Sequence, residues 1–178
     1  MQETWPQEVL QRARGIRLLA LDVDGTLTDG RLAYGADGHV TKTFHVRDGL
    51  GLRLLQRHGI VVALITARVS HALALRAQEL GIAHLYQGRD DKRGCLSEIA
   101  RALDLPLTAC AMVGDDLPDI GAMRVAGLAV AVADAHPWTA AVAHWCTQRP
   151  GGHGAVREVC DLLLHAQGLA GQERERWQ

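Results

Sequence analysis

The stretch IRLLALDVDGT, residues 16–26, decides the fold prediction. Residues 16–23 form an apolar run with β-branched residues at both ends, and an aspartate–glycine pair follows directly. This pattern is typical of a buried strand in a parallel sheet, followed by a turn. The run therefore predicts a central strand that leads into a loop carrying Asp22 and Asp24.

Further along the chain, apolar runs alternate with segments of helical period, which predicts a doubly wound, mostly parallel α/β sheet of the Rossmann type. The alternation RLAYGADGHVTKTFHV around a turn signal at 35–38 predicts a β-hairpin after the first strand. Further strands are predicted at 60–65, 83–86, 109–113 and 128–132, and helices at 50–58, 70–80, 91–104, 117–125 and 154–167.

The length of 178 residues fits one domain, 1–178, with a core over about 16–168 and the hairpin over about 30–46. The charged ending QERERWQ predicts a polar tail over about 169–178. A second domain is not expected, because the chain contains no linker-like or low-complexity stretch.

Charge and composition exclude several classes of protein. A formal net charge of −1 offers no basic field for nucleic acid, and no apolar run approaches the length of a membrane span. The four cysteines are scattered, which suggests reduced core residues of a cytoplasmic protein. Lys42 and Lys92 are the only lysines, so chemistry that requires an ammonium group has two candidates.

Polar signatures follow three of the predicted strands: Asp22 and Asp24 after the first, Thr66 after the second, and Asp115 with Asp116 after the third. Loops at the carboxyl ends of parallel strands converge, and ligands bind there. Acidic groups placed so close together repel one another unless a cation lies among them, and carboxylate and carbonyl oxygens suit Mg²⁺. We therefore expect a magnesium site at this edge of the sheet.

A metal and a lysine together could hold a phosphoryl group, whose transfer needs mainly positioning and charge neutralisation. Asp22 is then the nucleophile, and Asp24 protonates the leaving oxygen and later deprotonates water. Gly25 allows close backbone approach to phosphate. Thr66 offers a hydroxyl donor and Lys92 a fixed charge.

Taken singly, each signature has an ordinary structural interpretation. The motif DVDGT could be a turn with an aspartate hydrogen bond, and Thr66 could be a helix N-cap. Lys92 could be a solvated surface residue, and the run after 113 could be a strand-end turn. The phosphatase interpretation rests on their common order and their common place at strand ends.

In that order, the residues resemble the four motifs of the haloacid dehalogenase superfamily. The motifs are DVDGT at 22–26, Thr66 in LITAR, Lys92, and GDDLPD at 114–119. Asp24 favours a phosphatase over the related ion-pumping ATPases, which carry threonine there. The stretches FHVRDGLG (44–51), HLYQGRDDK (84–92) and GGHGAVREVCDLLL (151–164) further resemble the 3-deoxy-D-manno-octulosonate 8-phosphate (KDO 8-P) phosphatases.

This resemblance implies a magnesium-dependent phosphatase of a phosphorylated sugar acid, acting in lipopolysaccharide precursor synthesis. It implies a homotetramer without a large cap domain. Mg²⁺ would be held by the Asp22 side chain, the Asp24 carbonyl and Asp115. Asp116 and Asp119 would be supporting acids, and Thr66 and Lys92 would hold the phosphate. The implied substrate contacts are Gly25, Arg47, Gly49, Arg68 and Arg157.

Several alternatives stay open from the sequence. Close relatives act on nine-carbon sugar acid phosphates, and a phosphoaspartate signalling module would hold its phosphate without hydrolysing it. Ala67 stands where the second motif is expected to have glycine, which bears on substrate fit. The glycines around His153 could make a turn before a helix, or belong to a segment that closes an active site, its own or a neighbour's.

Overall fold

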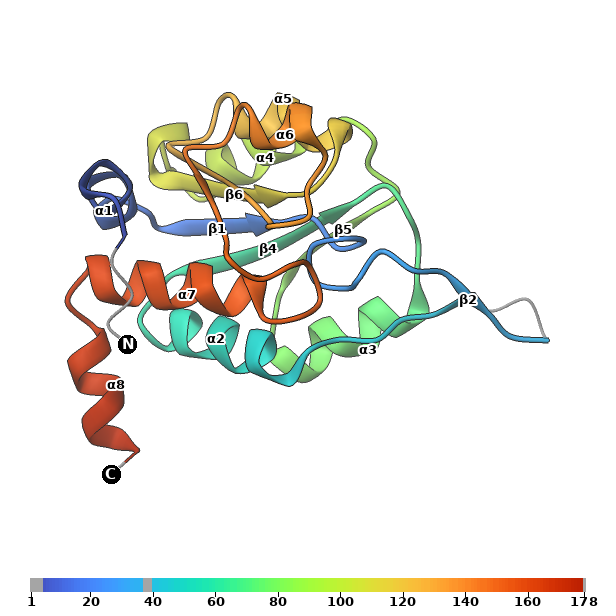
Figure 1. Cartoon of the computed structure of the whole chain (residues 1–178), viewed down its shortest axis with the longest axis horizontal. Coiled ribbons are helices and arrows are strands. Elements are labelled where there is room, and N and C mark those ends of the chain that lie inside the picture. The colour runs from blue at the N-terminus through green and yellow to red at the C-terminus, as the bar shows by residue number, and fades with distance from the viewer. Residues whose placement is uncertain (1–4, 37–39, 178) are drawn as a thin grey trace.

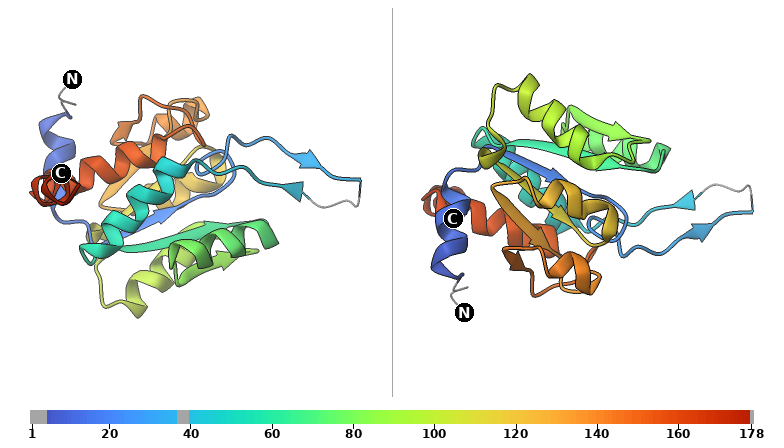
Figure 2. Two further views of the ribbon diagram at one scale, coloured as in Figure 1. Left: turned by 90° about the horizontal axis from the view of Figure 1, so that it is seen from below. Right: turned by 90° about the horizontal axis from the view of Figure 1, so that it is seen from above.

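In the computed structural model, residues 5–36 and 40–177 are described. A six-stranded, all-parallel sheet forms the centre, in the strand order β5-β4-β1-β6-β7-β8. Helices cover both faces, and the β2–β3 hairpin projects beyond the carboxyl ends of β1 and β4 (Figures 1 and 2). The predicted doubly wound fold is confirmed. The strands are β1 (Leu18–Leu21), β2 (Ala33–Tyr34), β3 (Val40–Thr41), β4 (Val61–Thr66), β5 (His84–Gln87), β6 (Cys110–Gly114), β7 (Leu128–Ala131) and β8 (Trp145–Cys146).

The helices alternate with the strands along the chain, as the periodicity predicts. Two of them are single 3₁₀ turns, η1 and η2, and the others are α-helical. They are α1 (Gln7–Arg14), α2 (Val46–Arg57), α3 (His71–Leu80), α4 (Lys92–Ala102), η1 (Leu107–Ala109), η2 (Leu117–Asp119), α5 (Ile120–Met123), α6 (Pro137–Ala140), α7 (Ala155–Ala166) and α8 (Ala170–Arg176).

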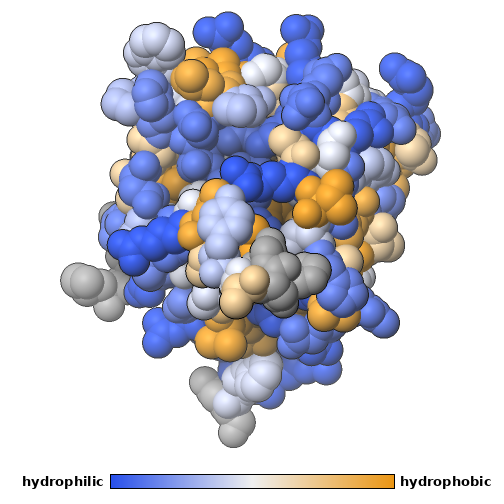
Figure 3. Space-filling view, turned by 90° about the vertical axis from the view of Figure 1, so that its right-hand side faces the viewer, coloured by the Kyte–Doolittle hydropathy of each residue, from blue (hydrophilic) through white to orange (hydrophobic). Residues whose placement is uncertain are grey.

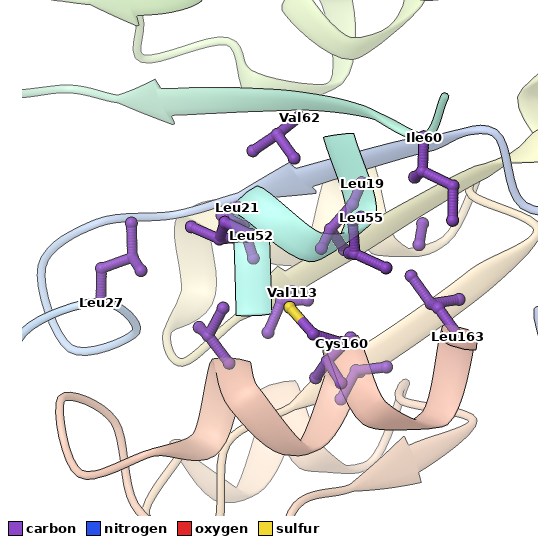
Figure 4. Close-up of a cluster of buried hydrophobic side chains, with 14 of the residues drawn as sticks. Leu19, Leu21, Leu27, Leu52, Leu55, Ile60, Val62, Val113, Cys160 and Leu163 are labelled. Atoms are coloured by element: carbon purple, nitrogen blue, oxygen red, sulfur yellow. The ribbon is translucent and has the colours of Figure 1, made fainter. Parts of the chain in front are cut away.

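The period of two along β1 divides the apolar residues between two cores. Leu19 and Leu21 point to the face covered by α1, α2, α3 and α7, whereas Leu18 and Ala20 point to the face covered by α4 and α5. Figure 4 shows the first core, in which side chains of α2 and α7 meet beneath β1. Burial on both faces explains why the central strand is apolar throughout.

Helix α2 begins at Val46, four residues before the predicted start at 50, so its first turn contains the run Arg47-Asp48-Gly49. The glycines there do not interrupt the helix but permit close packing. A Cβ at Gly49 would lie 2.2 Å from Nη2 of Arg76, and one at Gly51 would lie 2.9 Å from Cβ of Cys160. The glycines hid the start of this helix from the sequence pattern, because they resemble helix breakers. In the structure they leave room for Arg76 and Cys160 of neighbouring helices.

Other predictions differ in detail. The helix expected over 117–125 consists of η2 and the short α5, with Pro118 in the first turn of η2. Helices α1 and α6 and strand β8 were not predicted. Cys146 is exposed, while Cys95, Cys110 and Cys160 are buried and free. The hairpin is present, although part of its expected turn, 37–39, lies outside the described residues.

Within the predicted polar tail, residues 170–176 form helix α8. Its Glu173 is buried and accepts hydrogen bonds from Arg57 Nη1 at 2.9 Å and from His58 Nε2 at 2.8 Å. A charged sequence thus docks on the end of α2 through specific ion pairs, which composition does not reveal. Among the described residues, no helix is long and apolar enough to cross a bilayer.

Replacing Glu173 with alanine should lower the melting temperature at neutral pH, because two buried contacts are lost. Desolvation acts to raise the pKa of Glu173. Hydrogen bonds from His58 and Arg57 outweigh it and lower this pKa below its usual value of 4.5. A lowered pKa stabilises the fold above 4.5, and that stability is lost as the pH falls through the folded-state pKa. The difference in melting temperature between variant and wild type should therefore shrink in acid, as calorimetry would measure. A difference that grows in acid would contradict this account.

Candidate active site

The carboxyl ends of β1, β4 and β6 carry the acidic and polar residues that the sequence singled out. Asp22 directly follows β1, Thr66 ends β4, and Asp115 follows β6. In-register pairing of β1 with both neighbours brings these ends together. They lie on the side of the sheet from which the hairpin projects (Figure 1).

Lys92 binds two carboxylates at the centre of this cluster. Its Nζ lies 2.7 Å from Asp22 Oδ1 and 2.6 Å from Asp119 Oδ1, and all three side chains are almost completely buried. Burial acts to lower the pKa of Lys92, but the carboxylates of Asp22 and Asp119 outweigh it and raise this pKa. The ammonium group therefore stays charged. Lys92 is the first residue of α4, after its cap Asp91, and that position directs it into the cluster.

Asp119 organises the third strand end. Its Oδ2 accepts hydrogen bonds from the backbone N–H groups of Asp115 at 3.0 Å and Asp116 at 3.2 Å. Because its Oδ1 binds Lys92, both carboxylate oxygens are occupied. Asp116 differs, since its exposed side chain caps η2 by accepting from Leu117 N–H at 2.8 Å. Of the two expected supporting acids, only Asp119 contacts the lysine.

Asp22, Asp115 and Asp119 form a group in which one carboxylate oxygen of each residue lies within 4.8 Å of those of the other two. Desolvation, then repulsion from Asp119, raises the pKa of Asp22 to about 6. Desolvation, then repulsion from Asp22 and Asp119, raises the pKa of Asp115 to about 8. A divalent cation would relieve this repulsion, and carboxylate oxygens are the donors that Mg²⁺ prefers. The donor set therefore fits a magnesium ion.

Gly25 is required where the loop after β1 meets Asp115. Its φ is +90°, and a Cβ there would lie 2.1 Å from Asp115 Oδ2. Its N–H donates to Thr28 Oγ1 at 3.3 Å, so this donor is engaged within the loop. Thr26 Oγ1 donates to Asp115 Oδ1 at 3.2 Å, which joins the loop after β1 to the loop after β6.

Asp24 contacts a residue that the motif analysis did not assign. Lys42 directly follows β3. Its Nζ donates to Asp24 Oδ1, and the lysine side chain is only 4% exposed. The scarcity of lysine was the signal, because it left only Lys42 and Lys92 as ammonium donors. Spacing alone could not show that the hairpin folds back to place Lys42 beside the loop.

Thr66 is buried, and its Oγ1 accepts the Arg68 N–H at 3.2 Å, so the hydroxyl shapes the loop after β4. The cap of α3 is Ser70, which accepts from Leu73 N–H, and not Thr66. Ala67 is exposed on the same loop. Thr66 therefore shapes the loop after β4 and does not cap α3.

The expected substrate contacts are distributed over several segments. Arg47 and Arg68 are exposed, and neither guanidinium has a hydrogen bond or ion pair within residues 5–36 and 40–177. Arg157 instead pairs with Asp161 on its own helix, Nε to Oδ1 at 2.8 Å. Gly49 faces Arg76 and Leu80 of α3. Neither of these last contacts involves the acidic cluster.

The turn at 151–154 packs against the loop after β1 of the same chain. Gly152 N–H donates to Thr26 O at 3.0 Å, and a Cβ at Gly151 would lie 1.7 Å from Gly25 O. His153 is exposed. The glycines therefore do make the turn before α7, and that turn also supports the site.

Comparisons with known proteins identify the family of the chain. A family model for haloacid dehalogenase-like hydrolases matches residues 42–127. The chain is 50% identical over 160 residues to 3-deoxy-D-manno-octulosonate 8-phosphate phosphatase of Yersinia pestis, covering 90% of this chain and 86% of that protein. For the Escherichia coli protein of the same name, the identity is 48% over 161 residues, with the same coverages of 90% and 86%.

The chain is also similar to a solved structure over almost its whole length. The phosphatase of that name from Moraxella catarrhalis, in complex with a magnesium ion, a phosphate ion and a KDO molecule, superposes with a TM-score of 0.96 at 45% identity. The superposition covers 98% of this chain and 100% of that one.

Proposed function

The chain belongs to the haloacid dehalogenase-like hydrolases, and from that premise we propose that it is a magnesium-dependent phosphatase of 3-deoxy-D-manno-octulosonate 8-phosphate. The products would be the free sugar acid and inorganic phosphate. One observation carries the proposal: Asp22, Lys92, Asp119 and Asp115 form a single contacting cluster in a chain half identical to phosphatases of that name.

Asp22 and Asp115 are the side chains best placed to hold Mg²⁺, together with the Asp24 main-chain carbonyl. Both oxygens of Asp119 are engaged by Lys92 and backbone N–H groups, so Asp119 supports the ligands rather than joining them. When bound, the ion would neutralise phosphate charge and polarise the phosphorus–oxygen bonds.

Asp22 would attack phosphorus with a carboxylate oxygen, forming an acyl phosphate and breaking the bond to the sugar oxygen. Asp24 would protonate that leaving oxygen, then accept a proton from the water that attacks the acyl phosphate. Phosphate departs and the Asp22 carboxylate is restored. Lys92 and Thr66 would bind phosphate oxygens, and Lys42 would fix the orientation of Asp24.

Exposed arginines near this end of the sheet would recognise the rest of the substrate. Arg47 and Arg68 are exposed and have no side-chain partner in the described part of the chain. A guanidinium can bind the sugar-acid carboxylate through two parallel hydrogen bonds. Arg157 would first have to leave Asp161 to do so. Gly49 and Gly25 would act through their lack of a side chain. Gly49 lets Arg76 approach the backbone closely, and Gly25 does the same for Asp115.

A screen of sugar phosphates with the purified protein tests the substrate. It should include the eight-carbon substrate, nine-carbon sugar acid phosphates and small phosphates, each with and without EDTA. The highest kcat/KM is expected for the eight-carbon acid. Much faster turnover of nine-carbon or small phosphates would refute this substrate assignment while leaving the phosphatase assignment intact.

Removing metal should abolish turnover, and adding Mg²⁺ should restore it. Mg²⁺ should also raise the melting temperature, because an ion that binds only the folded protein stabilises it. Asp115→Asn should lose most of this thermal shift, whereas the matched change Asp104→Asn, at the opposite end of the sheet, should keep it. Equal thermal shifts in the two variants would exclude Asp115 as a ligand.

The proposal extends to a cytoplasmic homotetramer in lipopolysaccharide precursor synthesis. The face that carries the hairpin is mostly hydrophilic with separated hydrophobic patches (Figure 3). Leu32 and Tyr34 of the hairpin and Val46 at the start of α2 are exposed, and such side chains favour association. Sedimentation velocity should give the mass of four chains, and a monomer would refute the assembly.

A further inference from the structure

Asp48 is a buried acid that the reaction does not use. It lies in the first turn of α2, and its residue surface is 1% exposed. Burial raises its pKa, while hydrogen bonds from the backbone N–H groups of Arg157 and Gly154 oppose that rise. A carboxylate is costly to bury, so packing alone does not explain its presence.

The partner of Asp48 is the start of another helix. Its Oδ1 accepts the Arg157 N–H at 2.8 Å. Helix α7 begins at Ala155, and its own N-cap, Gly154, has no side chain to accept such a bond. Asp48 therefore caps α7 from α2, replacing the local cap that the sequence lacks.

The residues just before α7 contact the nucleophile loop. Gly152, whose φ is +70°, donates its N–H to Thr26 O at 3.0 Å. Gly151 N–H donates to Asp134 Oδ1 at 2.9 Å. Since Thr26 Oγ1 also donates to Asp115, the turn, the loop after β1 and the loop after β6 form one connected unit.

The other oxygen of Asp48 is unpaired. Neither Asp48 Oδ2 nor His45 Nδ1 has a hydrogen-bond partner within the described ranges, although both atoms are buried. Both residues line a small crevice between α2 and α3, beside Leu27 and Phe44. Buried polar atoms without partners are rare, and they tend to persist where they serve a functional constraint.

We propose that Asp48 is a positioning residue, which holds the 151–154 turn against residues 25–28 and so fixes the loop that carries Asp22. The effect on catalysis rests on the proposed function, whereas the physical coupling does not. The acceptor oxygen is what matters, so asparagine, which keeps an oxygen at that place, should largely replace aspartate.

Hydrogen exchange tests the coupling without any activity. In Asp48→Ala, amides in 148–157 and 22–29 should exchange faster than in wild type, and in Asp48→Asn they should remain protected. Glu173→Ala is the matched control, since it removes another buried carboxylate that binds the end of a helix far from the site. Unchanged exchange of 22–29 in Asp48→Ala, or equal acceleration in Glu173→Ala, would overturn the proposal.

Kinetics then separates positioning from general stability. In Asp48→Ala, kcat should fall roughly tenfold to a hundredfold with little change in KM, because a small displacement of reacting groups has effects of that size. Asp48→Asn should recover most of the rate, and Glu173→Ala should retain wild-type kcat per folded molecule. A wild-type kcat in folded Asp48→Ala would refute the positioning role.

A double variant identifies the route of the effect. Gly152→Ala places a Cβ 2.5 Å from Asp29 N and forces a strained φ, so it should displace the same turn. If both changes act through that turn, the double variant should be about as slow as the slower single variant. Multiplied losses would show independent effects and contradict the route. A wild-type protein that releases no phosphate would refute the proposed function, and hydrogen exchange would still decide the coupling.

Discussion

Replacing Asp22 with asparagine should abolish turnover while the fold survives. An amide cannot form the acyl phosphate, and loss of a nucleophile typically lowers kcat by roughly 10⁴-fold or more. The shapes of the two side chains match, and the backbone bond from Asp22 N–H to Val113 O at 2.9 Å does not involve the side chain. Phosphate release per folded molecule measures the loss.

The stability of this variant provides a second readout. Burial and Asp119 raise the pKa of Asp22 to about 6, so the folded protein disfavours the carboxylate. For an acid with a raised pKa, that destabilisation is complete above the folded-state value and disappears below about 4. In EDTA at pH 8, Asp22→Asn should therefore melt no lower than wild type. Substantial activity in the folded variant would refute Asp22 as the nucleophile, and Asp104→Asn serves as the control that keeps its rate.

Asp24→Asn should lower turnover of sugar phosphates by roughly 10²- to 10⁴-fold, the usual contribution of a general acid and base. The loss in the rate of phosphoprotein formation should be smaller with p-nitrophenyl phosphate, whose leaving group needs no proton. Hydrolysis of the acyl phosphate should become slow with that compound, so phosphoprotein should accumulate. Rapid quench at successive times measures both effects.

Asp22→Asn is the control for that experiment, because it can form no phosphoprotein. Equal losses in the rate of phosphoprotein formation for the sugar phosphate and for p-nitrophenyl phosphate would exclude Asp24 as the acid. The wild-type protein tests the signalling alternative in the same experiment. A stable wild-type phosphoprotein without repeated phosphate release would mean that the chain stores phosphate instead of hydrolysing it.

The sequence predicted the central architecture because its strands are buried on both faces. The run at 18–21 is fully buried, and such continuous apolar stretches have few alternatives in an α/β chain. Helix ends with strong local signals were also predictable, as at Gly81, whose φ is +69°. Local chemistry determines these features, so a single sequence contains them.

Elements stabilised by distant contacts were not predictable. Gly49 and Gly51 resemble helix breakers, yet they lie within α2 because Arg76 and Cys160 occupy the space of their missing side chains. The sequence of helix α8 resembles a solvated tail, but Glu173 in it pairs with Arg57 and His58. In each case the deciding partner is far away in the sequence.

The same distinction applies to the site. Asp22 and Asp115 directly follow strands and Thr66 ends one, so the predicted parallel strands already placed these three residues at one edge of the sheet. Lys92 begins the helix after β5 and was identified by its place in the motif order. Lys42 and Asp48 lie in the hairpin and in a helix turn, where no strand end of the parallel sheet marks them. Their roles depend on how the hairpin returns and how α2 meets α7, and both are tertiary features.

The most direct test of the account is to locate the phosphoryl group during turnover. Wild-type protein with the eight-carbon substrate and Mg²⁺ would be quenched within milliseconds, and borohydride would reduce any acyl phosphate to homoserine for mass spectrometry. The account predicts homoserine at position 22 and at no other acidic residue. Homoserine at 24, 115 or 119, or phosphate release with no modified carboxylate, would contradict it.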